Sequence, residues 1–413
     1  MATNVSEENW ISCYRKPDPS LWIGRTDTLN SSLETARQPQ RIHEVVQLLD
    51  LESATDENGI LNLNDRPDSP NSLFFPSFRV AIIGFCSDLG IQRNKGRVGA
   101  ADAPPVIRSR MANLAIQDPR LTILDSGDVV VENVANKAIP KLEYDHLGAL
   151  ALQNTYSLKN ASSRVYPDPL KQAQELLSDK ISLLIRHKIF TLILGGGHEV
   201  AKPHYDALKR AFPGQKIGII NLDAHFDLRQ DPLAPTSGTS FYEIWESEIG
   251  RLEPKLVPKN LDEKQQIIEP VKSTGFHYLT IGIQSFSNTP VLYETAKKTG
   301  TQFIEAKDIP ISGITSQQES EILTFMESVD RIMLTICMDV FQSAVSPGVS
   351  APSPLGMFPS QIIQILSLIQ KSGKVISADI AETNPILDQD GKTSALASFL
   401  GYHLICSARC IND

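Results

Sequence analysis

The sequence predicts a doubly wound α/β protein with a mostly parallel sheet of about eight strands. Eight short runs rich in branched aliphatic residues alternate, for the most part, with amphipathic helical passages, and this alternation is typical of βαβ units. The runs are continuously apolar, which predicts a sheet covered on both faces. They are residues 78–85, 121–130, 191–197, 216–223, 277–283, 301–306, 331–339 and 374–380.

Helical periodicity is clear between these runs. Residues 168–188 and 359–373 repeat apolar side chains at the spacing of one helix face. The segment RIHEVVQLLDLE, which begins at Arg41, has the same spacing, so we predict a helix there as well. Residues 56–72 contain four Asn, three Asp and two Pro and are expected to form a loop.

Length and composition indicate a globular protein. The chain has 413 residues, of which 41% are hydrophobic and 21% charged, and these are ordinary values for a folded domain. No internal repeat or low-complexity linker interrupts the alternating region. We therefore expect one domain over residues 76–413, preceded by an N-terminal extension, residues 1–75, that packs on it.

Charge and cysteine content exclude several classes of function. A net charge of −9 and a pI of about 5.5 argue against binding to nucleic acid or anionic lipid. No apolar run approaches the roughly 18–20 residues of a membrane span, and the first residues do not resemble a secretory signal. The five cysteines, at 13, 86, 337, 406 and 410, include no CxxC pair, which indicates a reducing compartment. We expect a cytoplasmic enzyme with a small-molecule substrate, and neither nucleic acid nor a membrane as partner.

Candidate functional residues lie at strand ends, because ligands of open α/β sheets bind beyond the carboxyl ends of the strands. In LGGGHEV, His198 follows three glycines, which let the backbone approach a crevice closely. Taken alone, such a histidine is more often a packed or loop residue than a ligand.

A stronger pattern follows the fourth run, in NLDAHFDLR, where Asp223, His225 and Asp227 alternate behind an apolar strand. Two carboxylates and an imidazole in so small a volume are costly unless a cation holds them. This donor set suits Mn²⁺, Fe²⁺, Ni²⁺ or Zn²⁺. The alternative is a salt-bridged loop with Arg229 as the partner, and we favour the metal site.

The last two strand ends add further candidates. In TICMDVF, Cys337 and Asp339 are two residues apart and therefore face the same way on a strand. The eighth run continues as ADIAETNP, which brings Asp379 and Glu382 to the same edge.

Together these residues resemble the ureohydrolases, the family of arginase, agmatinase and formimidoylglutamase. GGGHEV matches the GGxH motif, and Asp223, His225 and Asp227 match DAHxD. TICMDVFQS matches SxDxDxxDP only in part, and Glu382 fits the glutamate near the last strand.

Two further stretches are similar to the formimidoylglutamase branch. LWIGRTD, with Trp22, Gly24, Arg25 and Asp27, resembles its N-terminal W-x-G-R-x-D segment. GFCSDLGIQRNKGRVGAADAP, residues 84–104, resembles its glycine-rich loop. The likeness extends from about residue 20 to residue 405.

The resemblance implies a three-layer αβα fold with an arginase-like metallohydrolase domain, and a centre of two divalent ions, usually manganese. It implies that His198, Asp223 and Asp227 bind one ion. Asp223, His225 and Asp339 would bind the other, with Asp223 shared between them. Cys337 stands at the position of a second bridging aspartate. Family members are commonly oligomeric, so we expect a homo-oligomer.

The reaction implied by the formimidoylglutamase branch is hydrolysis of N-formimidoyl-L-glutamate to L-glutamate and formamide by a metal-bound hydroxide. Glu382 would hold the charge of the amidinium group. Asp227 would stabilise the tetrahedral intermediate and move its proton to the departing nitrogen. Arg93 and Arg97 are candidates for binding the substrate carboxylates, although loop arginines more often serve local structure.

Cys337 leaves three interpretations open. The first is a ligand of an altered two-metal site, where the softer sulfur favours Fe²⁺, Ni²⁺ or Zn²⁺ over Mn²⁺. The second is a small buried side chain that only fills space. The third is a degenerate site in a non-catalytic relative.

Gln342 replaces another aspartate of the same motif, and residues 236–246 lack the histidine that arginases carry there. Hydrolysis of another guanidino compound, with release of urea, is the alternative activity. Nucleotide binding is excluded, because the glycines of LGGGHEV do not form G-x-G-x-x-G and no Walker lysine follows.

Overall fold

The computed structural model describes residues 10–26, 41–63, 78–116, 118, 120–133, 168–230, 234–252 and 275–408. Asp27, Cys410, part of the loop predicted at 56–72 and the expected domain boundary lie outside these residues. Among the described residues, no helix has both the length and the apolar character needed to cross a membrane.

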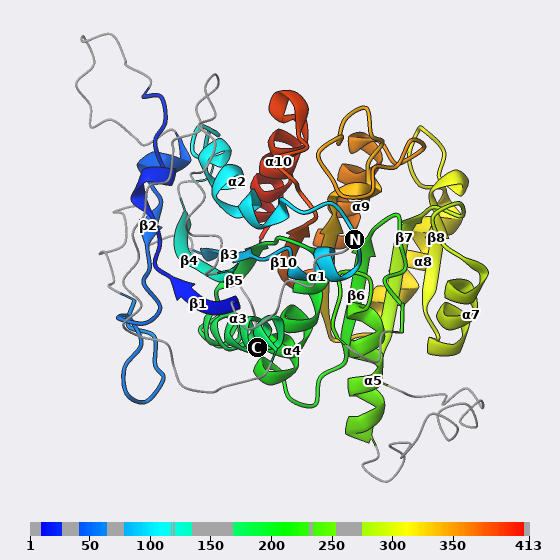
Figure 1. Cartoon of the computed structure of the whole chain (residues 1–413), viewed down its shortest axis with the longest axis horizontal. Helices are drawn as coiled ribbons and strands as arrows, with labels where there is room; N and C mark the ends of the chain where they lie inside the picture. The colour runs from blue at the N-terminus through cyan, green and yellow to red at the C-terminus, as the bar shows by residue number, and fades with distance from the viewer. Residues whose placement is uncertain are drawn as a thin grey trace.

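A ten-stranded sheet forms the centre of the molecule (Figure 1). All of its strand pairs are parallel except that of β1 with β4. The spatial order is β1-β4-β3-β5-β10-β9-β6-β7-β8, with β2 also paired to β4. The strands are β1 Trp10–Arg15, β2 Gln47–Leu48, β3 Phe78–Cys86, β4 Leu121–Asn133, β5 Phe190–Leu194, β6 Ile217–Leu222, β7 His277–Ile283, β8 Gln302–Glu305, β9 Arg331–Cys337 and β10 Val375–Ala381.

Helices cover both faces of the sheet (Figure 1). Buried residues of α3, α4, α5 and α7 pack on one face, and those of α2, α8, α9 and α10 pack on the other. The three-layer αβα fold with a mostly parallel sheet is therefore confirmed. The helices are α1 Leu89–Arg93, α2 Ala103–Met111, α3 Pro169–Arg186, α4 Ala201–Ala211, α5 Ser240–Leu252, α7 Pro290–Thr299, α8 Ser316–Glu327, α9 Pro359–Lys371 and α10 Lys392–Ser407.

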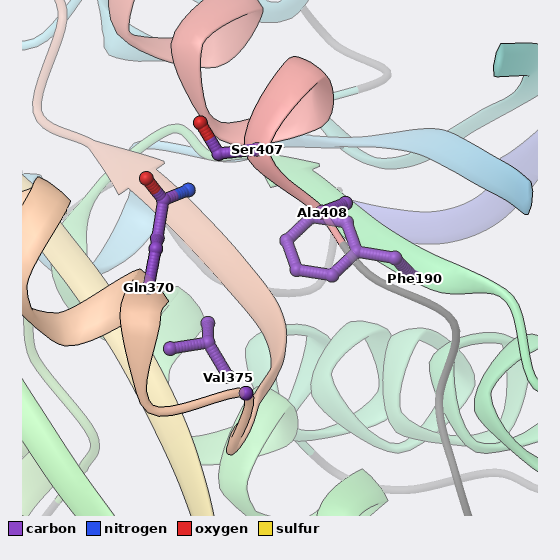
Figure 2. Close-up of a pocket in the computed structure, with 6 residues that line it drawn as sticks. Phe190, Gln370, Val375, Ser407 and Ala408 are labelled. Carbon is purple, nitrogen blue, oxygen red and sulfur yellow. The ribbon is translucent and has the colours of Figure 1, made fainter.

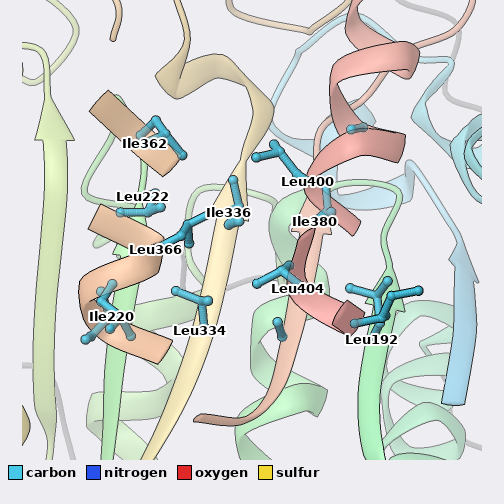
Figure 3. Close-up of a cluster of buried hydrophobic side chains, with 14 of the residues drawn as sticks. Leu192, Ile220, Leu222, Leu334, Ile336, Ile362, Leu366, Ile380, Leu400 and Leu404 are labelled. Atoms are coloured by element: carbon cyan, nitrogen blue, oxygen red, sulfur yellow. The ribbon is translucent and has the colours of Figure 1, made fainter. Parts of the chain in front are cut away.

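Each of the eight predicted strands is present. In the central strands the aliphatic side chains are buried on both sides of the sheet, whereas in β8, at the edge, Ile304 is buried and Phe303 is exposed. Figure 3 shows one such layer, in which Leu334 and Ile336 of β9 lie between Leu366 of α9 and Leu404 of α10. Burying a side chain of this size contributes about 1.5–3 kcal/mol. The core therefore fixes the positions of the central strands.

The two predicted helices begin at sequence signals that cap them. Asp168 accepts a hydrogen bond from the backbone N–H of Leu170 at the start of α3, and Pro169 occupies the first helical position. Pro359 opens α9 in the same way.

The helix predicted from Arg41 is wrong. The segment forms a single 3-10 turn, Ile42–Glu44, and then β2. Its backbone bonds to other parts of the chain, from Ile42 N–H to the carbonyl of Leu114 and from Leu49 N–H to the carbonyl of Asp125. Ile42 and Leu49 are buried in different hydrophobic clusters, so tertiary packing draws the segment along the sheet edge and overrides its periodicity.

Candidate metal centre

The predicted site residues meet at the carboxyl ends of four neighbouring central strands. These strands, β5, β10, β9 and β6, are adjacent and parallel. His198 follows β5, Glu382 follows β10, Asp339 follows β9 and Asp223 follows β6. Because every strand points the same way, residues far apart in sequence converge at one edge of the sheet.

Glycine is needed where the chain turns toward His198. A Cβ on Gly196 would lie 1.7 Å from the carbonyl oxygen of Ser87. The Gly197 N–H donates to that same oxygen at 2.9 Å, and the Gly196 carbonyl accepts from Glu382 N–H at 2.8 Å. The turn thus ties β5 to the loop after β3 and to the end of β10, which places His198 in the crevice between them.

The first group of donors surrounds Nδ1 of His198. This atom lies 3.0 Å from Oδ2 of Asp223 and 3.0 Å from Oδ2 of Asp227, yet it is buried and makes no hydrogen bond of acceptable geometry. Sγ of Cys337 belongs to the same cluster, because ligand atoms of His198, Asp223 and Cys337 all lie within 4.8 Å of one another.

The second group shares Asp223 and adds His225 and Asp339, again with ligand atoms within 4.8 Å of one another. Nδ1 of His225 lies 3.1 Å from Oδ2 of Asp339 and 3.5 Å from Oδ1 of Asp223. Oδ1 of Asp339 is buried and has no hydrogen-bond partner. Each group thus contains a buried ligand atom without a hydrogen-bond partner, Nδ1 of His198 in the first and Oδ1 of Asp339 in the second. Such atoms fit two divalent cations.

In the metal-free site, the imidazole rings of His198 and His225 lie among carboxylates, which changes the pKa values of both rings. Burial alone would lower the pKa of His198, but contacts with Asp223 and Asp227 outweigh it and leave this pKa well above the usual range. Burial also acts to lower the pKa of His225, but the nearby carboxylates of Asp339 and Asp223 outweigh burial and raise this pKa. The two imidazoles in turn hold the pKa of Asp223 below its ordinary value, although burial opposes this shift.

Within the described part of the chain, no lysine or arginine forms an ion pair with these acids. Asp223, Asp227 and Asp339 pair with histidines only. Arg229 donates instead to Oδ1 of Asn94, at 2.7 Å. The alternative of a salt-bridged loop around Arg229 is therefore wrong.

The two residues predicted to be catalytic have strained backbones. Among the described non-glycine residues, five have positive φ, and two of them are Asp227 (47°) and Glu382 (67°). Such conformations persist where the surrounding structure enforces them, often at functional sites. Glu382 is buried, and its Oε1 accepts a hydrogen bond from the His198 N–H at 3.0 Å. Burial, followed by the neighbouring carboxylates of Glu199 and Asp339, raises the pKa of Glu382.

Arg93 and Arg97 hold loops together in the structure. Arg93 forms an ion pair with Asp168, the N-cap of α3, at 2.9 Å. Arg97 donates to the carbonyls of Val349 and Ser350, at 2.6 and 2.9 Å. These contacts explain a structural role and leave substrate binding as a prediction.

Two polar residues beneath the centre, Thr335 and His204, were not predicted as site residues, and Asp379, expected at the sheet edge with Glu382, lies within β10. Thr335 contacts Nε2 of His198 at 2.8 Å and donates to Asp379 at 2.7 Å, and Asp379 contacts His204 at 2.6 Å. A polar residue inside an otherwise apolar strand is the signal that could have identified Thr335. Nothing in the sequence marks His204, which lies on α4.

A small pocket elsewhere on the molecule is not part of this centre (Figure 2). Phe190 and Val375, at its wall, are the first residues of β5 and β10. The pocket therefore lies at the amino ends of the strands whose carboxyl ends carry the donor groups.

Comparisons with known proteins agree with this geometry. The arginase family profile matches residues 78–406. A formimidoylglutamase from Geobacillus thermodenitrificans (strain NG80-2) is 32% identical over 387 residues, which cover 93% of this chain and 94% of that protein. Another, from Clostridium tetani (strain Massachusetts / E88), is 33% identical over 398 residues, or 95% of each chain. The chain belongs to the arginase family.

Solved structures show the same fold. The formimidoylglutamase of Bacillus subtilis (subsp. subtilis str. 168) superposes with a TM-score of 0.60 at 19% identity, covering 92% of this chain and 95% of that one. A Trypanosoma cruzi formiminoglutamase solved with Mn²⁺₂ gives a TM-score of 0.57 at 19% identity, over 82% of this chain and 95% of that chain. The predicted family and its arginase-like fold are thus confirmed.

Proposed function

We propose that the protein is a metal-dependent hydrolase that converts N-formimidoyl-L-glutamate and water to L-glutamate and formamide. The observation that carries this proposal is the pair of donor groups sharing Asp223, in a chain whose relatives of 32–33% identity are formimidoylglutamases. Two divalent ions, when bound, would lower the pKa of a shared water toward neutrality and so supply hydroxide.

His198, Asp223 and Asp227 would hold one ion, and Asp223, His225 and Asp339 the other. Imidazole and carboxylate donors suit manganese, and the T. cruzi formiminoglutamase was solved with Mn²⁺₂. Manganese is therefore the ion we propose, and Cys337 is the reason to test Fe²⁺, Ni²⁺ and Zn²⁺ as well.

Cys337 is proposed as a further ligand of the first ion. Its side chain is buried and its sulfur lies with His198 and Asp223. Burial, and then the charges of Asp223 and Asp339, raises the pKa of this thiol in the metal-free chain. A cation at the same point would reverse that balance, because metal binding deprotonates a coordinating thiol.

Glu382 and Asp227 would act on the substrate. A buried carboxylate without a cationic partner is stabilised by a cationic ligand, so Glu382 is suited to hold the amidinium group. Asp227 faces the first donor group from a fixed, strained backbone. From there it would stabilise the tetrahedral intermediate and pass a proton to the nitrogen that leaves with glutamate.

The substrate carboxylates require cationic donors, and we propose Arg97 and Arg93. Arg97 is the stronger candidate, because within the part of the chain that the structure describes its guanidinium contacts backbone carbonyls and pairs with no carboxylate. The charge of Arg93 is already paired with Asp168.

The remaining proposals concern the whole chain. Residues 1–75 would form an extension on the hydrolase domain of residues 76–413, as supported by β1 and β2, which join the sheet through β4. Cys86, Cys337 and Cys406 are free thiols, and this suits a cytoplasmic protein. A homo-oligomer, with no nucleic acid or membrane partner, remains our expectation from the family resemblance and the acidic charge.

Product analysis tests the activity. Purified protein reloaded with Mn²⁺ should release formamide and glutamate from N-formimidoyl-L-glutamate. Release of urea from arginine or agmatine instead would identify the alternative guanidino hydrolase. Binding of metal without turnover of any of these compounds would contradict the proposed function and indicate a non-catalytic relative.

A further inference from the structure

A chain of hydrogen bonds runs from the first donor group into the core of the protein. It begins at Nε2 of His198, the ring nitrogen opposite the donor atom. All five side chains in it are buried, at 1% exposure or less. The links are His198 Nε2 to Thr335 Oγ1 at 2.8 Å, Thr335 Oγ1 to Asp379 Oδ1 at 2.7 Å, Asp379 Oδ2 to His204 Nδ1 at 2.6 Å, and His204 Nε2 to Ser377 Oγ at 2.6 Å.

Three elements supply the four residues of this chain beyond His198. Thr335 of β9 and Asp379 of β10 are direct partners in the strand register, so their side chains lie side by side. Ser377 lies two residues before Asp379 on β10 and faces the same way. His204 reaches the same face from α4, which packs in the layer that covers it.

The chemistry of the groups fixes the direction of the two hydrogen bonds made by Thr335. Thr335 donates its single hydroxyl proton to Oδ1 of Asp379. The oxygen of Thr335 must then accept from His198, which places a proton on Nε2. In a neutral imidazole the other nitrogen, Nδ1, is consequently an acceptor. That nitrogen faces the Oδ2 atoms of Asp223 and Asp227 at 3.0 Å each.

We infer that Thr335, Asp379 and His204 are positioning residues that fix the Nε2–H tautomer of His198 and thereby direct its Nδ1 to the metal. The inference rests on the metal centre of the proposed function and deepens it. Asp379 and His204 touch neither donor group, and they act through Thr335 alone. Their burial makes the arrangement rigid, since a broken link would leave a polar group unpaired in the core.

The experiment compares isosteric and conservative variants. Thr335→Val removes the hydroxyl at constant shape, whereas Thr335→Ser retains it. Thr191→Val is the matched control, because Thr191 is an equally buried strand threonine whose hydroxyl donates to the Ile189 carbonyl. The affinity for each of two Zn²⁺ ions is measured by competition with a chelator, and thermal unfolding checks the fold.

Thr335→Val should weaken the affinity for one ion by about 10- to 100-fold and leave the other within about threefold, as expected when a group supporting a metal ligand is lost. Thr335→Ser and Thr191→Val should bind both ions like the wild type. Equal affinities in Thr335→Val and the wild type, or an equal loss in Thr191→Val, would overturn the inference.

Ring-nitrogen NMR gives a second readout that a merely structural role would not change. In ¹⁵N-labelled, Zn²⁺-loaded wild type, the signals missing from a His198→Asn variant should show a protonated Nε2. Asp379→Asn can donate to Thr335 and so leaves the Thr335 hydroxyl able to donate to Nε2 of His198, which should weaken the affinity for the same ion as Thr335→Val does. A wild-type ring protonated at Nδ1 alone would overturn the inference, even if the protein releases formamide. Absence of formamide release, with the tautomer and affinities as expected, would overturn only the proposed function.

Discussion

Oδ2 of Asp223 lies 3.0 Å from Nδ1 of His198, while Oδ1 of the same carboxylate lies 3.5 Å from Nδ1 of His225. Asp223 is thus the one residue common to both donor groups. Asp223→Asn should reduce the metal content from about two ions per chain to near zero. Asp339→Asn removes a ligand of the second group only and should leave about one ion. Elemental analysis of dialysed protein measures both, and equal metal content in the two variants would contradict the shared-ligand geometry.

The stability of the metal-free protein should fall as the pH rises from neutral to alkaline. The pKa values of His198 and His225 are raised above the ordinary value of 6.5. A group with a raised pKa stabilises the fold below its unfolded pKa, and this contribution is lost as the pH passes the folded-state pKa. Bound metal takes the place of these protons and should abolish the fall. Calorimetry with a chelator and with Mn²⁺ compares the two pH profiles, and parallel profiles would count against protonated histidines at the metal positions.

Eight strands and the two main helices could be predicted because local pattern and tertiary burial agree there. The segment from Arg41 could not, since its apolar residues serve two different clusters on either side of the sheet edge. β1 and β2 are short strands at that edge, and their partner β4 lies far along the chain. Periodicity within a segment carries no information about such partners.

The ligand candidates could be predicted because each follows an apolar strand, and parallel strands bring their carboxyl ends together. The hydrogen bonds that support His198 from below could not be predicted. Thr335 and Asp379 are 44 residues apart, and their contact depends on β9 and β10 being neighbours in a particular register. His204 comes from a helix on a different layer. Only the folded structure relates these three residues.

Spectroscopy of the Co²⁺-loaded protein tests whether Cys337 is a metal ligand. A Co²⁺-loaded wild type is expected to show a thiolate-to-cobalt charge-transfer band, because the sulfur would be a deprotonated ligand. The band should disappear in Cys337→Ser and persist in Cys86→Ser, which removes another buried thiol. Cys337→Asp should shift the metal preference toward Mn²⁺. A wild type that binds two Co²⁺ ions without the band would show that Cys337 only fills space.

Glu382→Gln should lower kcat/KM for formimidoylglutamate by about 100-fold or more, because a neutral amide cannot hold the charge of an amidinium. The metal content should stay unchanged, since Glu382 belongs to neither donor group. Glu248→Gln is the control, a buried glutamate on α5 that pairs with Lys209. A full loss of metal in Glu382→Gln would instead assign Glu382 to the metal centre.

Gly196→Ala should disrupt the centre without touching a ligand. The added Cβ would lie 1.7 Å from the Ser87 carbonyl oxygen, so the turn before His198 must move. We expect weaker metal binding and a lower Tm. Gly250→Ala is the control for Tm, because a Cβ at Gly250, on α5, would have nothing within 4 Å and its φ is not positive. Metal affinity equal to that of the wild type in Gly196→Ala would show that this turn does not position His198.

The most direct test is an anomalous difference map from crystals of the Mn²⁺-loaded protein. Two peaks should appear beyond the carboxyl ends of β5, β6 and β9. One should be bonded to Nδ1 of His198 and the other to Asp339, with Asp223 bonded to both. A map with no peak among these side chains, or with the acids turned away to pair with lysine or arginine, would contradict the account.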